Sequence, residues 1–436
     1  MNMTHARGFR GWLARNPTAL TIIAGLAAFG AYTSMYAFRK PFTAAGFSGL
    51  KLAGFDLKVL LVVAQMVGYT ISKFTGIKVV SEALPGRRIA MIALLIAMAF
   101  FPLILLPFVP APLQVLCLLV NGLPLGMIWG LVFSFLEGRK VTEFLGLGMS
   151  VSFIFASGWT KTTGQWVMSQ WHVDQLAMPA VTGLLFVPLL AVCLWLLSQL
   201  PPPSADDIAN RSVRQPMDSQ ARRQFLRRFG LPLVLLVLSY IVLTVYRDLR
   251  DTFMADVLKE LGQKSSSSVF ARIETFAGLG VMAALGGLWF IRNHWNALAV
   301  YHWVIALGAL LVGGSTLLFQ GGHLTPVAWI SVTGLGVYLA YVPFNSILFD
   351  RLLAATRQTG TASFLISVAD AGGYLFTMIL YLARLGTTGE IKWTQLTLHM
   401  GIVVAIAAPL LTLASWLTLR SHRQSDQLSS LSDRRA

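Results

Sequence analysis

The chain has 436 residues, of which 56% are hydrophobic and only 12% are charged. Soluble proteins carry about 25% charged residues, so this composition excludes an ordinary soluble domain and indicates a protein of the lipid bilayer. The formal net charge of +16 does not indicate nucleic-acid binding, because most cations lie at the ends of apolar runs. Cys117 and Cys193 both lie inside apolar runs, which argues against a disulfide framework.

Segments long enough to cross a bilayer follow one another along the chain. The basic N-terminus, residues 1–16, leads directly into the first of them, so we expect an uncleaved first span. Spans in the first half are predicted at 18–38, 58–79, 88–108, 112–134, 144–167 and 178–199. Spans in the second half are predicted at 229–250, 267–291, 297–319, 325–348, 361–384 and 396–419. The sequence therefore predicts an all-α integral membrane protein with twelve transmembrane helices.

One long polar segment divides these spans equally. We predict an N-terminal six-helix bundle at 1–200, a basic linker at 201–228, a C-terminal six-helix bundle at 229–420 and a tail at 421–436. Most loop lysines and arginines lie on the side of the linker and the termini; the opposite side carries Lys51, Lys58, Lys259, Lys264, Arg384 and Lys392. The positive-inside rule therefore places the linker and both termini in the cytoplasm.

The two halves also share a spacing of charged residues. Arg39 and Arg247 are 208 positions apart, and Lys161 and Asp370 are 209 positions apart. A third match joins glycine-containing segments of the fourth and tenth spans. Matches in one register predict an internal duplication, and hence two pseudo-symmetric bundles of the kind that secondary transporters use.

Charged side chains within or at the edges of the spans are the candidate functional residues. Each such charge costs about 2.5–3.5 kcal/mol at membrane depth, so it needs a partner, water or a function. The candidates are Arg39, Lys40, Lys73, Lys161, Arg247, Arg250, Asp251, Arg272, Glu274 and Asp370. Arg250 and Arg272 are expected to be solvated near the outer boundary. Glu274 and Asp370 are interpreted either as partners of the cations or as proton carriers.

Tyrosines accompany two of these cations at helical spacing. Tyr32 and Tyr36 precede Arg39 on one helix face, and Tyr69 precedes Lys73 by four residues. An arginine at the end of a span can also simply reach the headgroups, but its recurrence in the second half favours a ligand role. The predicted substrate ligands are Arg39, Arg247, Lys73, Tyr32, Tyr36, Tyr69 and Lys161. The predicted gating or coupling residues are Lys40, Asp251, Glu274 and Asp370.

These residues resemble the pattern of the major facilitator superfamily, and within it the organophosphate:phosphate antiporters of the glycerol-3-phosphate and hexose-phosphate type. The matching positions are Tyr32, Tyr36, Arg39 and Lys40 in the first span, Tyr69 and Lys73 in the second, Arg247 and Asp251 in the seventh, and Glu274 in the eighth. The chain departs from the family in its fifth span, which lacks a histidine and carries Lys161 about one turn further on. It also lacks the superfamily's aspartate between the second and third spans.

The resemblance implies a central site between two bundles that rock in alternating access, with a small phosphorylated or otherwise anionic metabolite as substrate and inorganic phosphate as a candidate exchange partner. Two arginines, reinforced by Lys73, would form a cationic clamp for a dianion. We predict that Arg39 faces Arg247 across a water-filled cavity. We also predict that Lys40 pairs with Asp251 or Glu274, and that Lys73 approaches Asp370.

Two other functions stay open at this point. One is a proton-coupled symporter of another organic solute, with Asp370 or Glu274 as the titrating group; the other is a membrane-embedded sensor of phosphate esters without flux. We recognise no metal cluster, nucleophile–base pair or phosphate-cradling glycine loop in the sequence, so we expect neither enzymatic activity nor a cofactor. The expected protein is a monomer of a bacterial-type inner (plasma) membrane that binds no nucleic acid.

Overall fold

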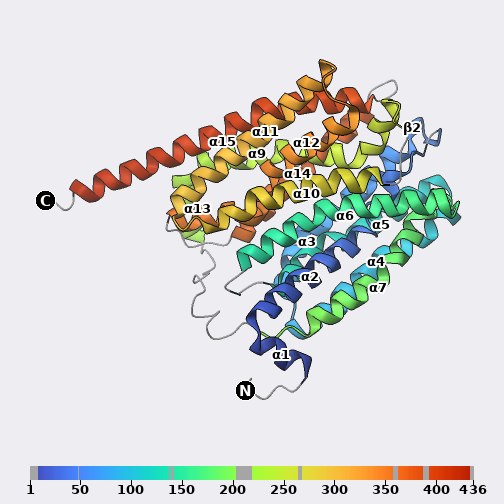
Figure 1. Cartoon of the computed structure of the whole chain (residues 1–436), viewed down its shortest axis with the longest axis horizontal. Helices are drawn as coiled ribbons and strands as arrows, with labels where there is room; N and C mark the ends of the chain where they lie inside the picture. The colour runs from blue at the N-terminus through green and yellow to red at the C-terminus, as the bar shows by residue number, and fades with distance from the viewer. Residues whose placement is uncertain are drawn as a thin grey trace.

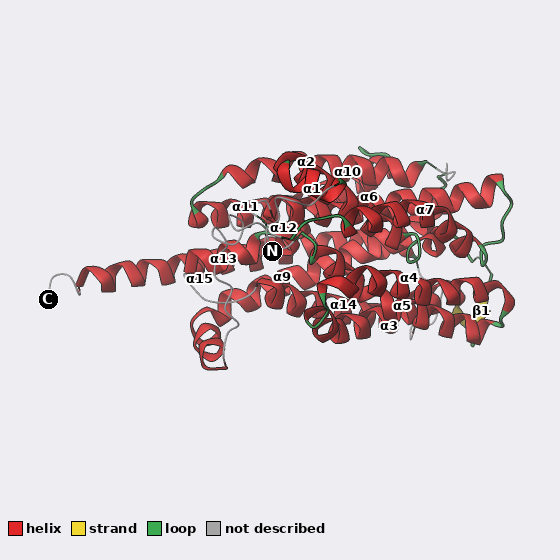
Figure 2. Ribbon diagram, turned by 90° about the horizontal axis from the view of Figure 1, so that it is seen from below, coloured by secondary structure: helices red, strands yellow, loops and turns green. Residues whose placement is uncertain are grey.

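The computed structural model describes residues 8–47, 49–136, 139, 142–202, 219–263, 268–356, 362–385 and 392–432. Long helices run side by side and form almost the whole of it (Figures 1 and 2). The first half contains α2 (Pro17–Tyr36), α3 (Leu57–Ser81), α4 (Arg88–Leu105), α5 (Ala111–Phe133), α6 (Thr142–Gln170) and α7 (Met178–Ser198). The second half contains α9 (Ser219–Glu260), α10 (Val269–Gly286), α11 (His294–Gln320), α12 (Pro326–Ser346), α14 (Ala362–Leu385) and α15 (Trp393–Ser432). Each predicted span therefore corresponds to one long helix.

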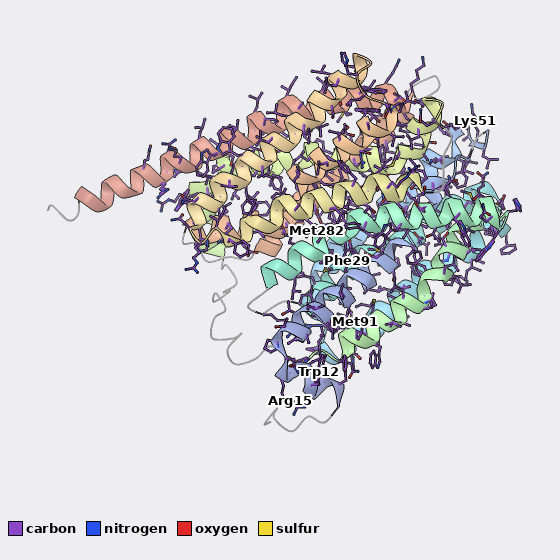
Figure 3. All side chains as sticks on the ribbon, in the orientation of Figure 1. Trp12, Arg15, Phe29, Lys51, Met91 and Met282 are labelled. Carbon is purple, nitrogen blue, oxygen red and sulfur yellow. The ribbon has the colours of Figure 1, made fainter. Side chains whose placement is uncertain are left out.

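Shorter elements connect or precede these helices. They are α1 (Phe9–Arg15), α13 (Leu348–Thr356), and the 3₁₀ turns η2 (Pro41–Ala44), η3 (Pro85–Arg87), η4 (Leu106–Phe108) and η5 (Gly287–Phe290). Strands β1 (Lys51–Leu52) and β2 (Phe55–Asp56) form a small antiparallel hairpin in which Lys51 pairs with Asp56. The hairpin lies at the end of the bundle opposite to the two chain termini (Figure 1), and the labelled Lys51 lies far from Arg15 in Figure 3. We call these two ends the hairpin end and the terminal end.

The side chains are sorted as expected for a protein that lipid surrounds. Ten of the described helices are long and apolar enough to cross a membrane. Large apolar side chains lie on the outside, for example Phe101, Leu184 and Leu410, while Lys161 and Asp370 are buried inside. The two last residues belong to α6 and α14, the long helices that are not among the ten.

Each half packs around its own helices, and two helix pairs make the largest contacts between the halves, with a smaller contact of α6 with α12. In the first half α2 lies against α6 and α7, and α3 lies against α5; in the second half α9 and α11 both lie against α15. Between the halves, α6 packs along α10 and α3 packs against α14. The approach of α6 to α10 requires a glycine, because a Cβ atom at Gly158 would lie 2.7 Å from Cβ of Glu274.

Helix α9 is longer than the predicted seventh span. It has 42 residues, begins at Ser219 within the predicted linker, and continues to Glu260 past a non-helical backbone conformation at Phe253. The middle of the predicted linker, residues 203–218, lies outside the described residues. The prediction that this span ends at residue 250 was therefore wrong, with a consequence for Arg250 that is described below.

Candidate functional site

Most of the buried charges lie around α9, a helix of the second half that faces the first half at the interface. The buried charged residues of this helix are Arg247, Asp248, Arg250 and Asp251. Residues three or four apart share a helix face, so Arg247 and Asp248 each lie on the same side of the helix as Asp251. The partners come from the turn between α2 and η2 and from α3, α6, α10, α12 and α14. They form two networks that flank a pair of arginines.

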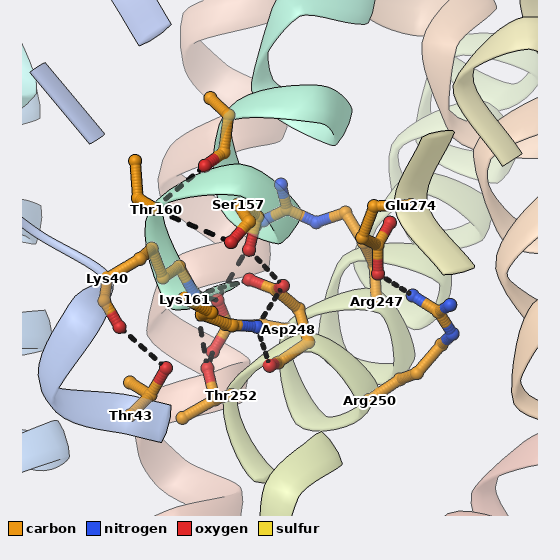
Figure 4. A network of polar contacts seen from close by, with 12 residues as sticks. Lys40, Thr43, Ser157, Thr160, Lys161, Arg247, Asp248, Arg250, Thr252 and Glu274 are labelled. Atoms are coloured by element: carbon orange, nitrogen blue, oxygen red, sulfur yellow. Dashed lines mark hydrogen bonds and ion pairs between the residues drawn. The ribbon is translucent and has the colours of Figure 1, made fainter. Parts of the chain in front are cut away.

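The first network surrounds Asp251, near the hairpin end. One carboxylate oxygen of Asp251 lies 2.6 Å from Nζ of Lys40, and the other lies 2.6 Å from Nζ of Lys161. The hydroxyl of Ser157 donates to the same carboxylate, and Lys161 also donates to the backbone carbonyl of Asp251. Figure 4 shows both lysines converging on α9. The predicted contact between Lys40 and Asp251 is thus confirmed; its role as a gate stays a prediction.

Glu274, the alternative partner of Lys40, binds Arg250 instead. Nη1 of Arg250 lies 2.8 Å from Oε1 of Glu274, and its Nε and Nη2 donate to the carbonyl oxygen of Ile330. The expectation that Arg250 is solvated was wrong, because α9 continues beyond it and only 2% of its surface is exposed. Gly334 makes room for this side chain, since a Cβ atom there would lie 2.2 Å from Nη2 of Arg250. Arg272 is exposed, as expected.

The second network surrounds Asp370, closer to the terminal end. Nζ of Lys73 on α3 lies 3.0 Å from Oδ2 of Asp370 on α14, which confirms the predicted contact. The Tyr240 hydroxyl donates to the other oxygen of Asp370. That hydroxyl also lies 2.7 Å from the Tyr341 hydroxyl, and it accepts a hydrogen bond of 3.0 Å from Nδ2 of Asn345. Asp370 therefore has hydrogen-bond donors on both oxygens.

Arg39 and Arg247 lie between the two networks, and tyrosine rings surround them. Cζ of Arg39 is 3.8 Å from the centroid of the Tyr69 ring, and Cζ of Arg247 is 4.5 Å from that of Tyr341. Cζ of Arg39 also lies 5.9 Å from the Tyr36 ring and 6.0 Å from the Tyr374 ring. Both tyrosines are also near Arg247, so the two arginines converge on one region. The Tyr32 ring packs edge-on against Tyr36, with 5.4 Å between ring centroids. The water-filled cavity between the arginines stays a prediction.

Neither arginine has a carboxylate at hydrogen-bond distance within the described part of the chain. The shortest approach is that of Nη2 of Arg247 to Oδ1 of Asp248, at 4.0 Å. The Nε atoms of Arg39 and Arg247 are both buried without a hydrogen-bond partner among the described residues. Only 5% and 7% of the two residues is exposed. A buried guanidinium without a carboxylate is costly, and an anionic ligand would supply the missing acceptors.

The described ion pairs between the halves share one polarity. In each of them the lysine comes from the first half and the aspartate from the second half. The pairs are Lys40 with Asp248 and Asp251, Lys58 with Asp256, Lys73 with Asp370, and Lys161 with Asp251. Lys58 was expected among the loop cations of the outer side. Instead its Nζ is buried, 2.6 Å from Asp256 and 2.8 Å from the carbonyl oxygens of Thr43 and Ala45.

The charges of the arginine pair, the two networks and the neighbouring Arg250–Glu274 pair do not balance. The cations are Arg39, Lys40, Lys73, Lys161, Arg247 and Arg250; the carboxylates are Asp248, Asp251, Glu274 and Asp370. Lys58 and Asp256 neutralise one another. Two positive charges are therefore in excess, as many as the arginines that lack a carboxylate partner. An anionic ligand could neutralise this excess.

Sequence reasoning missed several residues of this region. Asp248, Tyr240, Tyr341 and Tyr374 were not singled out, although all of them contact the predicted residues. One feature of the sequence could have indicated Asp248, because it lies three residues before Asp251 and so shares the helix face of that predicted residue. The three tyrosines are on three different helices of the second half. Their convergence depends on the rotation of each helix, which periodicity alone does not fix.

The fold and the charged interface define a multi-pass membrane protein of twelve helices with the major facilitator fold. Comparison with solved structures shows this fold. The chain superposes on the POT family transporter PepTSo with a TM-score of 0.59 at 12% identity, covering 93% of this chain and 98% of that chain. A variant of the nucleoside transporter NupG gives a TM-score of 0.58 at 13% identity, covering 92% of this chain and 99% of that chain. The human organic anion transporter MFSD10 (TETRAN) gives a TM-score of 0.54 at 14% identity, covering 92% of this chain and 98% of that chain.

The sequence places the chain in a particular family. Residues 41–422 match the model described as "Family of unknown function (DUF5690)", and the chain belongs to this family. No curated protein has a matching sequence. The major facilitator fold expected from the sequence is confirmed, whereas the resemblance to the organophosphate:phosphate antiporters stays a prediction.

Proposed function

We propose that this protein is a secondary transporter that carries a small dianion across the membrane by alternating access. The observation that carries this proposal is the pair Arg39 and Arg247, buried at the interface of the halves with no carboxylate at hydrogen-bond distance in the described structure. Guanidinium groups bind phosphate and carboxylate oxygens in paired fashion. The two excess positive charges favour a dianion, such as a phosphorylated metabolite.

The two networks support movement of the halves about this site. The Asp251 network joins them on one side of the arginines and the Asp370 network joins them on the other, and both consist of ion pairs that can separate without breaking either half. An anion bound by one arginine from each half would draw the halves together, which couples binding to closure. Exchange for inorganic phosphate is the form of transport that the resemblance to organophosphate:phosphate antiporters suggests.

The experiment is a flux measurement in proteoliposomes. Purified protein is reconstituted into vesicles loaded with inorganic phosphate, and uptake of labelled phosphate and phosphate esters is followed. We expect Arg39→Gln and Arg247→Gln each to abolish uptake, while Arg272→Gln, a change at an exposed arginine, leaves it intact. Uptake that both interface variants retain would refute the proposal. Binding without any uptake would instead support a sensor.

One observation favours proton-coupled symport as a second candidate. Glu274 is fully buried, and its Oε2 has no hydrogen-bond partner among the described residues. A buried carboxylate with an unpartnered oxygen is a candidate proton site. Asp370 is a poorer candidate, because both of its oxygens accept hydrogen bonds, whereas Glu274 accepts one from Arg250 on Oε1 alone. If a pH gradient alone drives uptake and Glu274→Gln removes that drive, the symport function holds; uptake that is indifferent to the gradient excludes it.

A further inference from the structure

Asp248 follows Arg247 directly in sequence but does not neutralise it. Its Oδ1 lies 4.0 Å from Nη2 of Arg247 and 3.9 Å from Nζ of Lys40. Charge-assisted hydrogen bonds between nitrogen and oxygen are about 2.7–2.9 Å long, so neither contact is a hydrogen bond. The residue is buried, with 3% of its surface exposed. A buried carboxylate thus stands beside the arginine without a direct bond to it.

The other carboxylate oxygen explains this separation. Oδ2 of Asp248 accepts hydrogen bonds from the Tyr381 hydroxyl at 3.0 Å and from Oγ1 of Thr252 at 3.3 Å. Tyr381 belongs to α14, is fully buried, and packs edge-on against Phe253, which itself stacks on Trp393. The tyrosine therefore occupies a fixed position and holds the carboxylate away from Arg247.

A carboxylate held at this distance acts on a ligand through its charge. A ligand oxygen bonded to Nη2 of Arg247 would lie within about 7 Å of Oδ1 of Asp248, given the 4.0 Å between these two side chains and a hydrogen bond of about 3 Å. At that distance two unit charges interact appreciably inside a protein. The repulsion grows with every negative charge that the ligand carries, whereas Arg247 stays free to bind it.

We propose that Asp248 is a specificity-determining residue that restricts the site to dianions and rejects trianions, and that Tyr381 is the residue that positions it. This inference rests on the proposed function, because it assigns the charge class of the ligand at the same site. Without Asp248 the buried region would carry three excess positive charges and would suit a trianion. With Asp248 free to turn toward Arg247, the carboxylate would compete with any anion.

The test compares ligand charge across variants of the purified full chain. The probes are the monoanion dimethyl phosphate, inorganic phosphate as its dianion, and pyrophosphate as its trianion at mildly alkaline pH, with binding measured by calorimetry. For Asp248→Asn we expect affinity for pyrophosphate relative to phosphate to rise about tenfold, from the loss of one nearby unit charge. For Tyr381→Phe we expect affinity for phosphate to fall about tenfold, because the released carboxylate can bond to Arg247. Asp56→Asn, at an exposed position of β2, should change neither value.

The outcomes distinguish failure of the proposed function from failure of the inference about Asp248. If the wild-type chain binds none of the probes, the proposed function fails. If it binds phosphate but Asp248→Asn keeps the wild-type ratio of pyrophosphate to phosphate, the proposed function stands and this inference fails. Should Asp248→Asn not fold, Tyr381→Phe carries the test, since it keeps every charge; an unchanged affinity for phosphate then overturns the inference. Comparing ratios between variants removes the effect of probe size.

Discussion

Lys73 on α3 and Asp370 on α14 form an ion pair of 3.0 Å that joins the two halves of the molecule. The pair lies beside the arginines, because the Tyr69 ring contacts both Lys73, at 5.6 Å, and Arg39, at 3.8 Å. Displacement of either charge would therefore change both the surroundings of Arg39 and the contact between the halves.

This pair can be tested by a double-mutant cycle. Lys73→Ala leaves Asp370 partly buried without its cation and should lower the free energy of unfolding by about 3 kcal/mol. Lys73→Ala combined with Asp370→Ala removes both charges and should recover most of the loss. Thermal unfolding in detergent measures both. Additive losses in the double variant would contradict a structural pair, and loss of pH-driven uptake in Asp370→Asn with exchange intact would instead identify a proton carrier.

Arg39 should not tolerate replacement by lysine. Arg39→Lys keeps the positive charge but loses the planar fork that binds two oxygens at once, so we expect phosphate affinity to fall about a hundredfold. The matched control is Arg272→Lys, at an exposed position of α10. Calorimetric titration with phosphate measures both variants. Equal affinity in Arg39→Lys and the wild type would show that charge alone suffices there.

Substitution of Asp251 should destabilise the protein more than substitution of any other carboxylate described at the interface. It binds Lys40 and Lys161 at 2.6 Å each, and both lysines are buried. Asp251→Asn would leave the buried Lys161 ammonium group without its carboxylate and Lys40 with only the longer contact of 3.9 Å to Asp248. It should cost about 3–5 kcal/mol, the loss typical of one broken buried pair. Lys40→Ala should cost less and should shift the population of inward- and outward-facing states, which site-specific labelling can measure. An unchanged population and an unchanged transport rate would refute the gate.

Gly334 offers a test of packing around the buried pair of Arg250 and Glu274. A Cβ atom at Gly334 would lie 2.2 Å from Nη2 of Arg250, a guanidinium group that three hydrogen bonds hold in place. Gly334→Ala should therefore lower the free energy of unfolding by about 1–3 kcal/mol. Gly314→Ala is the control, because no atom lies within 4 Å of the added Cβ. There alanine should stabilise the helix by about 0.5–1 kcal/mol. Thermal unfolding compares the two, and equal effects would contradict the fixed position of Arg250.

Much of the fold could be predicted because the bilayer imposes it. A run of apolar residues must form a helix in lipid, so each predicted span matches a long helix. The ends of the helices were harder to predict, since lipid no longer constrains the chain there. Arg250 illustrates this error. The predicted span ended at that residue, but α9 continues to Glu260, which places the arginine inside the bundle.

The site could be predicted in part for a different reason. Lipid would penalise the charges of Lys40, Asp251, Lys73 and Asp370, so these residues could be identified as candidates. The resemblance to the major facilitator superfamily then implied which spans, and hence which of these charges, meet. Asp248 and Tyr381 were not predicted as site residues. Tyrosine costs little in a membrane helix, so its sequence position gives no energetic signal, and only the rotation of α14 shows that Tyr381 binds Asp248.

The shared polarity of the ion pairs between the halves has a consequence for biosynthesis. Lys40, Lys58, Lys73 and Lys161 are all translated before any of their aspartates, and the pair closest in sequence, Lys161 and Asp251, is 90 residues apart. The first half is therefore fully synthesised while its interface lysines still lack counter-ions. Two copies of this half would bring lysine against lysine and repel one another, which disfavours premature dimers on the ribosome. The arrival of α9 supplies the carboxylates that bind Lys40, Lys58 and Lys161, whereas Lys73 gains its partner only with Asp370 on α14. Docking of the halves can therefore begin with the seventh span, but it is complete only after the eleventh.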